Sequence, residues 1–361
     1  MTDFNRGAQN DPVGHDGHRA GGSTEPHKPV KRWTSAVARP RRLRATESLR
    51  RLTRETRLSV DQLVYPLFVA PGDGHARPID AMPGQFVHSV DQVGGEARRV
   101  ADLGIPAVLL FGRTESKDPQ GREASSPTGE VQRAVAAIKD TVPELTVVTD
   151  VCLCAYTDHG HCGIVVQGAI NNDRSVARIV DVALSHADAG ADLVAPSDML
   201  DGRVGASRTA RDTAGHVNVG ILAYAAKYAS AFYGPFREAA DSAPEFGDRR
   251  SYQLDPSNGR EAIREVELDV AEGADIVMVK PALLNLDVVA RVRETVTVPV
   301  AAYSVSGEYA AIKAAAARGW IDERMAALEA FTSIVRAGAQ IVVTYYAPDI
   351  AVWLQEDKAQ A

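Results

Sequence analysis

Short apolar runs alternate with longer amphipathic stretches over most of the chain. Apolar runs of this length are typical of strands buried on both faces, and apolar positions spaced three and four apart are typical of helices. The runs predict eight strands, at 63–69, 107–112, 146–151, 193–198, 217–224, 275–280, 298–305 and 340–346. The stretches between them predict helices, including those at 91–103, 129–140, 175–189, 259–272, 285–295 and 323–337.

The connections between these elements favour one fold. Three helices end on a glycine that leads straight into the next strand, in the sequences DAGADLVAP, AEGADIVMV and RAGAQIVVT, as a connection from helix to strand requires. Eight strand–helix units predict an α/β protein with a closed (β/α)8 TIM barrel rather than an open doubly wound sheet. No G-x-G-x-x-G motif follows the first strand, which argues against a dinucleotide-binding fold.

The region before the barrel has a different composition. Residues 1–37 are rich in Gly, Pro and His and lack apolar periodicity, so we expect a disordered tail. Residues 38–62 are basic and carry leucines that suit a short docking helix, so we expect an extended N-terminal arm for subunit contacts. Residues 63–361 form the predicted catalytic barrel.

Charge and composition narrow the range of partners. Residues 1–57 carry 13 Lys and Arg against 6 Asp and Glu, whereas the rest of the chain carries 27 against 41. Nucleic acid could therefore bind only through the arm, and pairing of the arm with the acidic body of a neighbouring subunit explains the charges equally well. The sequence has no apolar run of about 18 residues and no signal-peptide pattern, so we expect a cytoplasmic protein without a membrane span.

Polar residues gather where the predicted strands end, which is the catalytic rim of such a barrel. Lys280 ends a buried strand, and burial disfavours its charged form, so we expect a nucleophilic amine. Lys227 lies on the same rim, and because two cations repel, at least one lysine should be neutral. The other rim residues are Asp150, Cys152, Cys154, Ser197, Asp198, Ser304, Ser306, Tyr345 and Tyr346.

The only three cysteines follow the third strand, at Cys152, Cys154 and Cys162. Their C-x-C-x₇-C spacing predicts one soft, tetrahedral cation such as zinc. Three thiolates leave the fourth position open, as in a catalytic site. The alternative is a closed structural site with His159 or His161 as the fourth ligand.

A stretch rich in Phe, Tyr, Gly and Pro at 223–256 suits a lid. Its arginines, Arg237 and Arg249, suit the capture of a carboxylate. Two imine-forming lysines, a soft metal with a free position and these arginines describe the condensation of two amino-ketone acids with loss of water.

The sequence resembles the porphobilinogen synthase (5-aminolevulinate dehydratase) family, in its zinc-dependent bacterial branch, over residues 38–355. The shared motifs are DVCLCxYTxHGHCG, APSDMxDGR, AKxASxFYGPFRxA, FGDRRxYQ, MVKPA, VSGEYA and TYYAP. The resemblance implies a (β/α)8 barrel whose arm wraps a neighbour, commonly in a homo-octamer. It also implies the condensation of two 5-aminolevulinate molecules to porphobilinogen in heme biosynthesis.

Residue roles follow from the resemblance position by position. Lys280 would form the Schiff base with the first substrate and Lys227 would engage the second, beside zinc on the three cysteines. Ser306 and Tyr345 would hold the carboxylate of the first substrate. The carboxylate of the second would be held by Arg237, Arg249 and Gln253. The pocket would be lined by Asp150, Ser197, Asp198 and Tyr233. Glu265 matches a glutamate of the bacterial allosteric magnesium site.

Two other functions remain open on the residues alone. A class I Schiff-base aldolase needs one lysine and no metal, and the cysteines and the second lysine argue against it. A nucleic-acid-binding or scaffold protein would use the basic arm and leave the polar rim without a purpose.

Overall fold

The computed structural model describes residues 39–359, and the predicted disordered tail, 1–37, lies outside them. The described residues belong to two compact units, one ending at Arg54 and one covering Glu55–Ala361, and each is described by itself. Within the described part, no helix is both long enough and apolar enough to cross a membrane.

The first unit contains a 3-10 helix at Pro40–Arg44 and helix α1 at Glu47–Leu52. Thr46 caps α1, because its side chain accepts a hydrogen bond from the Leu49 N–H at 3.2 Å. Leu43 and Leu52 are exposed. The short helix predicted for the arm is confirmed, and its role in subunit contacts stays a prediction.

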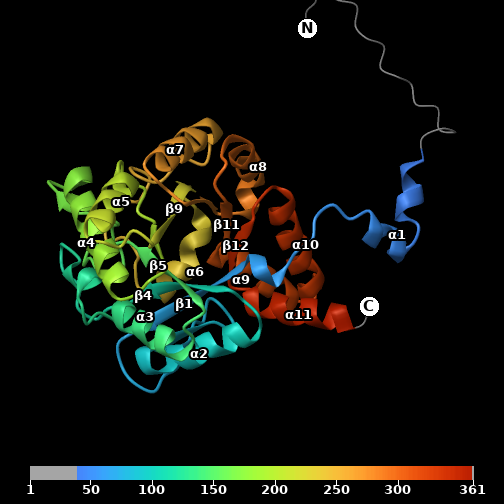
Figure 1. Ribbon diagram of the computed structural model, residues 1–361, viewed down its shortest axis with the longest axis horizontal. Coiled ribbons are helices and arrows are strands. Elements are labelled where there is room, and N and C mark those ends of the chain that lie inside the picture. The colour runs from blue at the N-terminus through green and yellow to red at the C-terminus, as the bar shows by residue number, and fades with distance from the viewer. Residues whose placement is uncertain (1–38, 360–361) are drawn as a thin grey trace, which may run out of the picture. The chain divides into compact units, whose positions relative to one another are not determined.

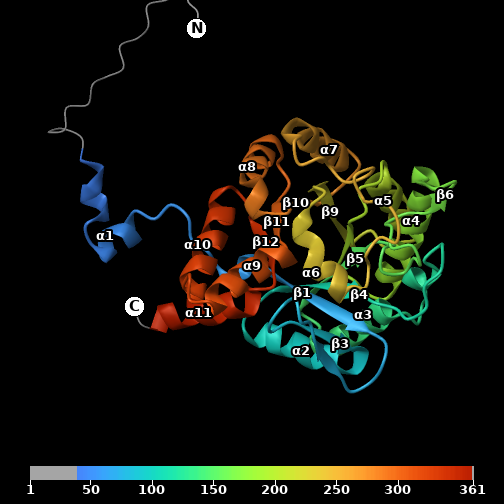
Figure 2. The same ribbon diagram turned by 180° about the vertical axis from the view of Figure 1, so that it is seen from behind.

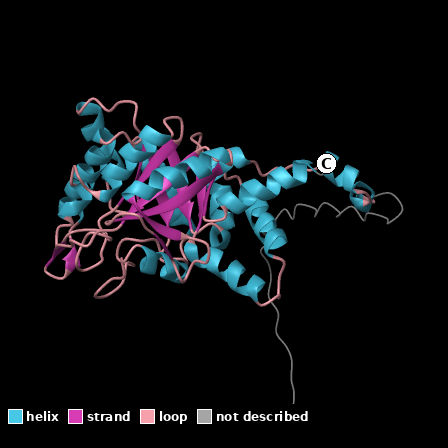
Figure 3. Ribbon diagram, turned by 90° about the horizontal axis from the view of Figure 1, so that it is seen from below, coloured by secondary structure: helices cyan, strands magenta, loops and turns pink. Residues whose placement is uncertain are grey.

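The second unit is a closed barrel of eight parallel strands surrounded by helices (Figure 3). The barrel closes because the last strand pairs with the first, with Leu63 opposite Val342. Every residue of the first strand is buried, as expected for a strand between a filled barrel interior and an outer helical layer. The barrel strands are β1 (Leu63–Ala70), β4 (Ala107–Gly112), β5 (Thr146–Val151), β8 (Leu193–Pro196), β9 (Gly220–Lys227), β10 (Ile276–Lys280), β11 (Val300–Ser304) and β12 (Ile341–Thr344). The predicted (β/α)8 fold is confirmed.

Helices alternate with these strands and form the outer layer (Figure 1). They turn apolar residues such as Val266 and Phe331 toward the barrel. The helices of this unit are α2 (Val90–Asp102), α3 (Glu130–Thr141), α4 (Asn172–Asp188), α5 (Arg203–Thr213), α6 (Gly234–Ala239), α7 (Gly259–Ala271), α8 (Leu286–Thr295), α9 (Ser306–Ala317), α10 (Glu323–Arg336) and α11 (Ala347–Ala359). Short elements supplement them: the strands β2 (Ala76–Pro78), β3 (Phe86–Ser89), β6 (Val165–Val166) and β7 (Ala169–Ile170), and 3-10 helices at Val60–Gln62, Arg122–Ser125, Ala231–Tyr233 and Leu283–Asn285.

The predicted glycine stops end α4, α7 and α10. Gly190, Gly273 and Gly338 all have left-handed backbone angles, with φ of 99°, 100° and 119°. After Gly190, the Ala191 N–H reaches back to the His186 carbonyl at 3.1 Å, which closes the last turn of α4. The next strand starts three residues after each glycine, at Leu193, Ile276 and Ile341, so each glycine fixes where that strand begins.

One strand differs from its predicted range. The pattern places the fifth barrel strand at 217–224, whereas β9 covers Gly220–Lys227. Val217 is 63% exposed, and the hydrogen bond from the Val219 N–H to the His216 carbonyl, at 3.1 Å, closes a turn before the strand. The apolar Val217 lies in this turn, which is why the predicted strand began too early. Because β9 also ends later than predicted, Lys227 is its last residue.

Candidate active site

The two lysines end adjacent strands, β9 and β10 (Figure 2), and lie directly opposite each other in the sheet register. The register slips between Val277 and Val279, where β9 holds one extra residue. Successive side chains of a strand point to opposite faces of the sheet, so one extra residue turns each later side chain of that strand to the other face. Lys227 therefore shares the face of Lys280, and both are buried, with 6% and 5% exposure.

Aromatic rings surround the Lys280 amine. Its Nζ lies 4.2 Å from the ring centroid of Tyr303, 5.1 Å from that of Tyr224 and 5.2 Å from that of Phe236. Burial in this apolar setting, together with the nearby charge of Lys227, lowers the pKa of Lys280 to about 7. About half of the Lys280 amine is then neutral and nucleophilic at pH 7.

Asp150 is the last but one residue of β5 and lies near the two lysines. Burial raises the pKa of its carboxyl to about 6, and the charge of Lys227 opposes the rise. Its Oδ1 atom has no hydrogen-bond partner. A buried carboxyl with a pKa close to that of a neighbouring amine can exchange protons with groups between them, so Asp150 suits a proton-transfer role.

The following strand end, after β8, presents Ser197 and Asp198, which are both buried. Lys227 donates a hydrogen bond from Nζ to the Ser197 carbonyl. The Asp198 carboxylate accepts from the Leu200 N–H at 2.9 Å, and its second oxygen has no partner. The backbone of this segment thus fixes Lys227, while Asp198 keeps a free acceptor.

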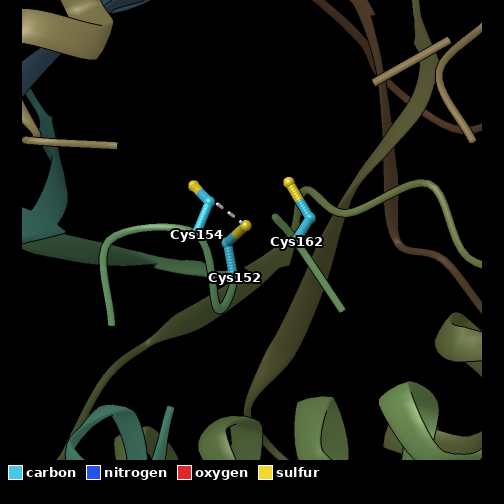
Figure 4. Close-up of side chains that lie close together, drawn as sticks. All are labelled: Cys152, Cys154 and Cys162. Carbon is cyan, nitrogen blue, oxygen red and sulfur yellow. Dashed lines mark hydrogen bonds between the residues drawn. The ribbon is translucent and has the colours of Figure 1, made fainter. Parts of the chain in front are cut away.

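The three cysteines come together on the loop after β5 (Figure 4). Their sulfur atoms lie within 4.8 Å of one another and all three side chains are buried. Hydrogen bonds from Cys152 and Cys162 hold the pKa of the Cys154 thiol well below its usual range. Among residues 39–359, this is the one group of three Cys, His, Asp or Glu residues whose ligand atoms could share an ion. Three converging buried sulfurs, one of them on a thiol with a lowered pKa, fit a soft cation.

The two candidate histidines have other contacts. The ring of His161 uses both nitrogens: Nδ1 lies 3.0 Å from the Tyr252 hydroxyl and Nε2 lies 2.9 Å from the Phe246 carbonyl. Nδ1 of His159 accepts from the His161 N–H at 3.1 Å. These contacts favour an open fourth position over closure by His161.

The stretch after β9 carries Arg237, Arg249 and Gln253. The Nε atoms of both arginines and both polar atoms of the Gln253 side chain are buried without hydrogen-bond partners. Unpaired buried donors are costly unless a ligand satisfies them, so this group suits an anionic ligand. Arg249 also donates to the Gly160 and Ser242 carbonyls, a structural role that the sequence does not reveal.

Ser306 and Tyr345 lie at the ends of the next strands in the barrel. The Ser306 hydroxyl accepts from the Phe236 N–H at 3.0 Å, and the Tyr345 hydroxyl lies 3.0 Å from that of Tyr303. Tyr233 donates from its hydroxyl to the Tyr228 carbonyl at 2.7 Å. Its ring centroid lies 5.3 Å from the Lys280 amine.

Glu265 lies apart from this group, on α7. It lines a cavity of about 690 Å³ together with Asp201, Glu261 and Gln253, and neither lysine reaches that cavity. Burial raises the pKa of Glu265, and the charge of Arg203 opposes the rise. No three carboxylate ligand atoms converge there within residues 39–359, so the magnesium site stays a prediction.

Of the aromatic residues around Lys280, Tyr233 was among the predicted site residues, whereas Tyr224, Tyr303 and Phe236 were not. Tyr224 lies inside β9 and Tyr303 inside β11, where apolar neighbours hide them in the pattern. Their positions in the sequence could have identified two of them: Tyr303 directly precedes the rim residue Ser304, and Tyr224 is three residues before Lys227.

The fold and the site together define a (β/α)8-barrel enzyme with two buried lysines beside a cysteine triad at its catalytic rim. Comparison with known proteins gives the family: the delta-aminolevulinic acid dehydratase family matches residues 37–353, and the chain belongs to it. The relative from Synechocystis sp. is 54% identical over 88% of this chain and 98% of its own, and the one from Mycobacterium tuberculosis is 52% identical over 88% and 97%. The crystal structure of the Toxoplasma gondii enzyme, solved with its product porphobilinogen, is 46% identical with a TM-score of 0.87, over 89% of this chain and 92% of that one.

Proposed function

We propose that this chain condenses two molecules of 5-aminolevulinate to porphobilinogen with loss of two waters, the reaction of its family, and that Lys280 forms the Schiff base with the first substrate. One observation carries this assignment: the Lys280 amine is buried among aromatic rings with a pKa of about 7. The neutral amine adds to the ketone of the first substrate, and loss of water leaves an imine. Lys227, opposite Lys280 in the register, engages the second substrate in the same way.

The remaining rim residues bind and orient. Ser306 and Tyr345 hold the carboxylate of the first substrate, and Arg237, Arg249 and Gln253 hold that of the second, which would accept from the unpaired Nε donors of the arginines and the Nε2 donor of Gln253. Asp150, with its pKa near 6, moves protons between the lysines and the reacting carbons. Ser197, Asp198 and Tyr233 line the pocket and exclude water.

Cys152, Cys154 and Cys162 are the residues that would hold zinc. When bound, zinc would supply Lewis-acid polarisation of a carbonyl beside the second substrate. Thiolate ligands argue against magnesium at this position, because magnesium prefers oxygen ligands.

The remaining predictions concern assembly, effectors and location. We propose a homo-oligomer, an octamer as the family resemblance implies, and two exposed leucines of the arm, Leu43 and Leu52, support a role for it in association. Magnesium at Glu265, the absence of nucleic-acid binding and a cytoplasmic location stay predictions.

Trapping with borohydride tests the chemistry. The protein is incubated with 5-aminolevulinate and sodium borohydride, and the labelled peptide is identified by mass spectrometry. We expect the adduct on Lys280 and, in a parallel sample without borohydride, formation of a pyrrole that stops when zinc is removed. A label found only on surface lysines would contradict the assignment of Lys280. An aldolase that uses one lysine would form the adduct but no pyrrole, with or without chelator.

A further inference from the structure

One buried carboxylate connects the two loops that follow β10 and β11. Glu308 lies in the first turn of α9 and is 3% exposed. Its Oε2 accepts from the Val305 N–H at 2.8 Å, just before the helix, and its Oε1 accepts from the Leu283 N–H at 2.8 Å, three residues after Lys280. Burial raises the pKa of this carboxyl to about 7, although the hydrogen bonds from Val305 and Leu283 oppose the rise.

An ordinary helix cap explains only half of this arrangement. A capping glutamate reaches back to the backbone at the start of its own helix, as Oε2 does. The hydrogen bond from the Leu283 N–H to Oε1 joins Glu308 to a different βα loop. Capping alone would not explain why this carboxyl is buried, because burial of a carboxyl is unfavourable and a cap can work equally well in solvent. A backbone hydrogen bond from the Ala282 N–H to the Tyr303 carbonyl of β11, at 2.9 Å, reinforces this connection.

The two joined loops carry the two groups proposed to hold one substrate molecule. Lys280 would bind its ketone, and Ser306, which directly follows Val305, would bind its carboxylate. We propose that Glu308 is a positioning residue that fixes the separation of Lys280 and Ser306, so that the enzyme selects ketones carrying a carboxylate at the matching distance. This inference rests on the proposed function, since it assigns Lys280 and Ser306 to the same substrate.

The test compares two ketones. Levulinate has a ketone and a carboxylate and uses both loops, whereas acetone has a ketone alone and uses only Lys280. Borohydride trapping on Lys280 is measured by intact mass against the concentration of each ketone. Glu308→Gln keeps the size of the side chain but replaces one acceptor oxygen with an NH2 group, which cannot accept from a backbone N–H. We expect the half-trapping concentration to rise about tenfold for levulinate and to stay unchanged for acetone, because one charge-assisted hydrogen bond is lost.

Four further variants make the result specific. Ser306→Ala should show the same selective loss, and the double variant should lose no more than either single variant, because both changes act on one contact. Asp322→Asn changes a cap that only serves its own helix, α10, through the Met325 N–H, and should leave both ketones unaffected. Glu308→Asp, whose shorter side chain cannot reach both loops, should repeat the Glu308→Gln result. The ratio of the two half-trapping concentrations is insensitive to any unfolded fraction of a variant.

The experiment distinguishes failure of the positioning role from failure of the proposed function. An equal loss for levulinate and acetone, or no change for either, would overturn the positioning role and leave Glu308 as a structural cap. Failure of the unmodified enzyme to trap levulinate on Lys280 would instead overturn the proposed function, and the inference with it.

Discussion

The pH dependence of imine formation on Lys280 is the most direct consequence of its surroundings. A lysine with the ordinary pKa of 10.5 is neutral in only about 0.03% of molecules at pH 7, whereas a pKa of about 7 makes about half of them neutral. Burial and the neighbouring cation thus increase the reactive fraction by roughly a thousandfold. The neutral form is gained as pH rises, so trapping should increase through about pH 7 and level off above it.

Two variants test the causes of this shift. Lys227 lowers the pKa of Lys280 and Asp150 raises it. Lys227→Met should therefore move the midpoint of trapping to higher pH, and Asp150→Asn should move it to lower pH. Opposite shifts from two neighbouring substitutions cannot come from a general loosening of the site.

The assay is a series of short borohydride reactions with levulinate, started at increasing pH and stopped before completion. The adduct on Lys280 is quantified by peptide mass spectrometry, and the thermal midpoint of each sample shows that the protein stays folded. Trapping that keeps rising toward pH 10 would refute the argument, because it would show an amine with ordinary solvation.

Three further results are expected. Cys154→Ala should lose bound zinc and pyrrole formation but keep its melting temperature and the adduct on Lys280; a lower melting temperature with loss of the adduct would indicate a structural metal. Arg237→Ala should weaken binding of the second substrate by about 1.5–3 kcal/mol and leave trapping on Lys280 intact. Arg249→Ala should have the same effect and should also loosen the loop at Gly160, to which Arg249 donates a hydrogen bond at 2.9 Å. Limited proteolysis of the two folded variants distinguishes a loosened loop from weaker binding alone. Removal of residues 1–54 should give smaller, less active species by light scattering, and an unchanged mass would show that the arm is dispensable for association.

The sequence predicts those parts of the site that depend on strand order. Lys280 and the cysteines follow strands whose apolar runs are unmistakable, and a barrel brings the ends of such strands to one rim whatever its details. The burial of Lys280 could be predicted for the same reason.

Properties that depend on packing between distant residues could not be predicted. The aromatic rings of Tyr303 and Phe236 approach Lys280 from another strand and from α6, and no local pattern encodes that meeting. The hydrogen bonds of Arg249 to the Gly160 and Ser242 carbonyls likewise depend on how the segment after β9 packs against the cysteine loop.

The extra residue in β9 decides on which side of the barrel wall the second lysine lies. Between Ala223 and Ala226 the strand takes three steps while β10 takes two, from Val277 to Val279. If the same two strands paired residue for residue from Ala223 onward, Ala226 would lie opposite Lys280, and Lys227 would follow it on the other face, toward the outer helices. A barrel with the same sequence and the same strand order would then bring only one of its two amines to the interior, so the bulge is as necessary for pairing the amines as the lysines themselves.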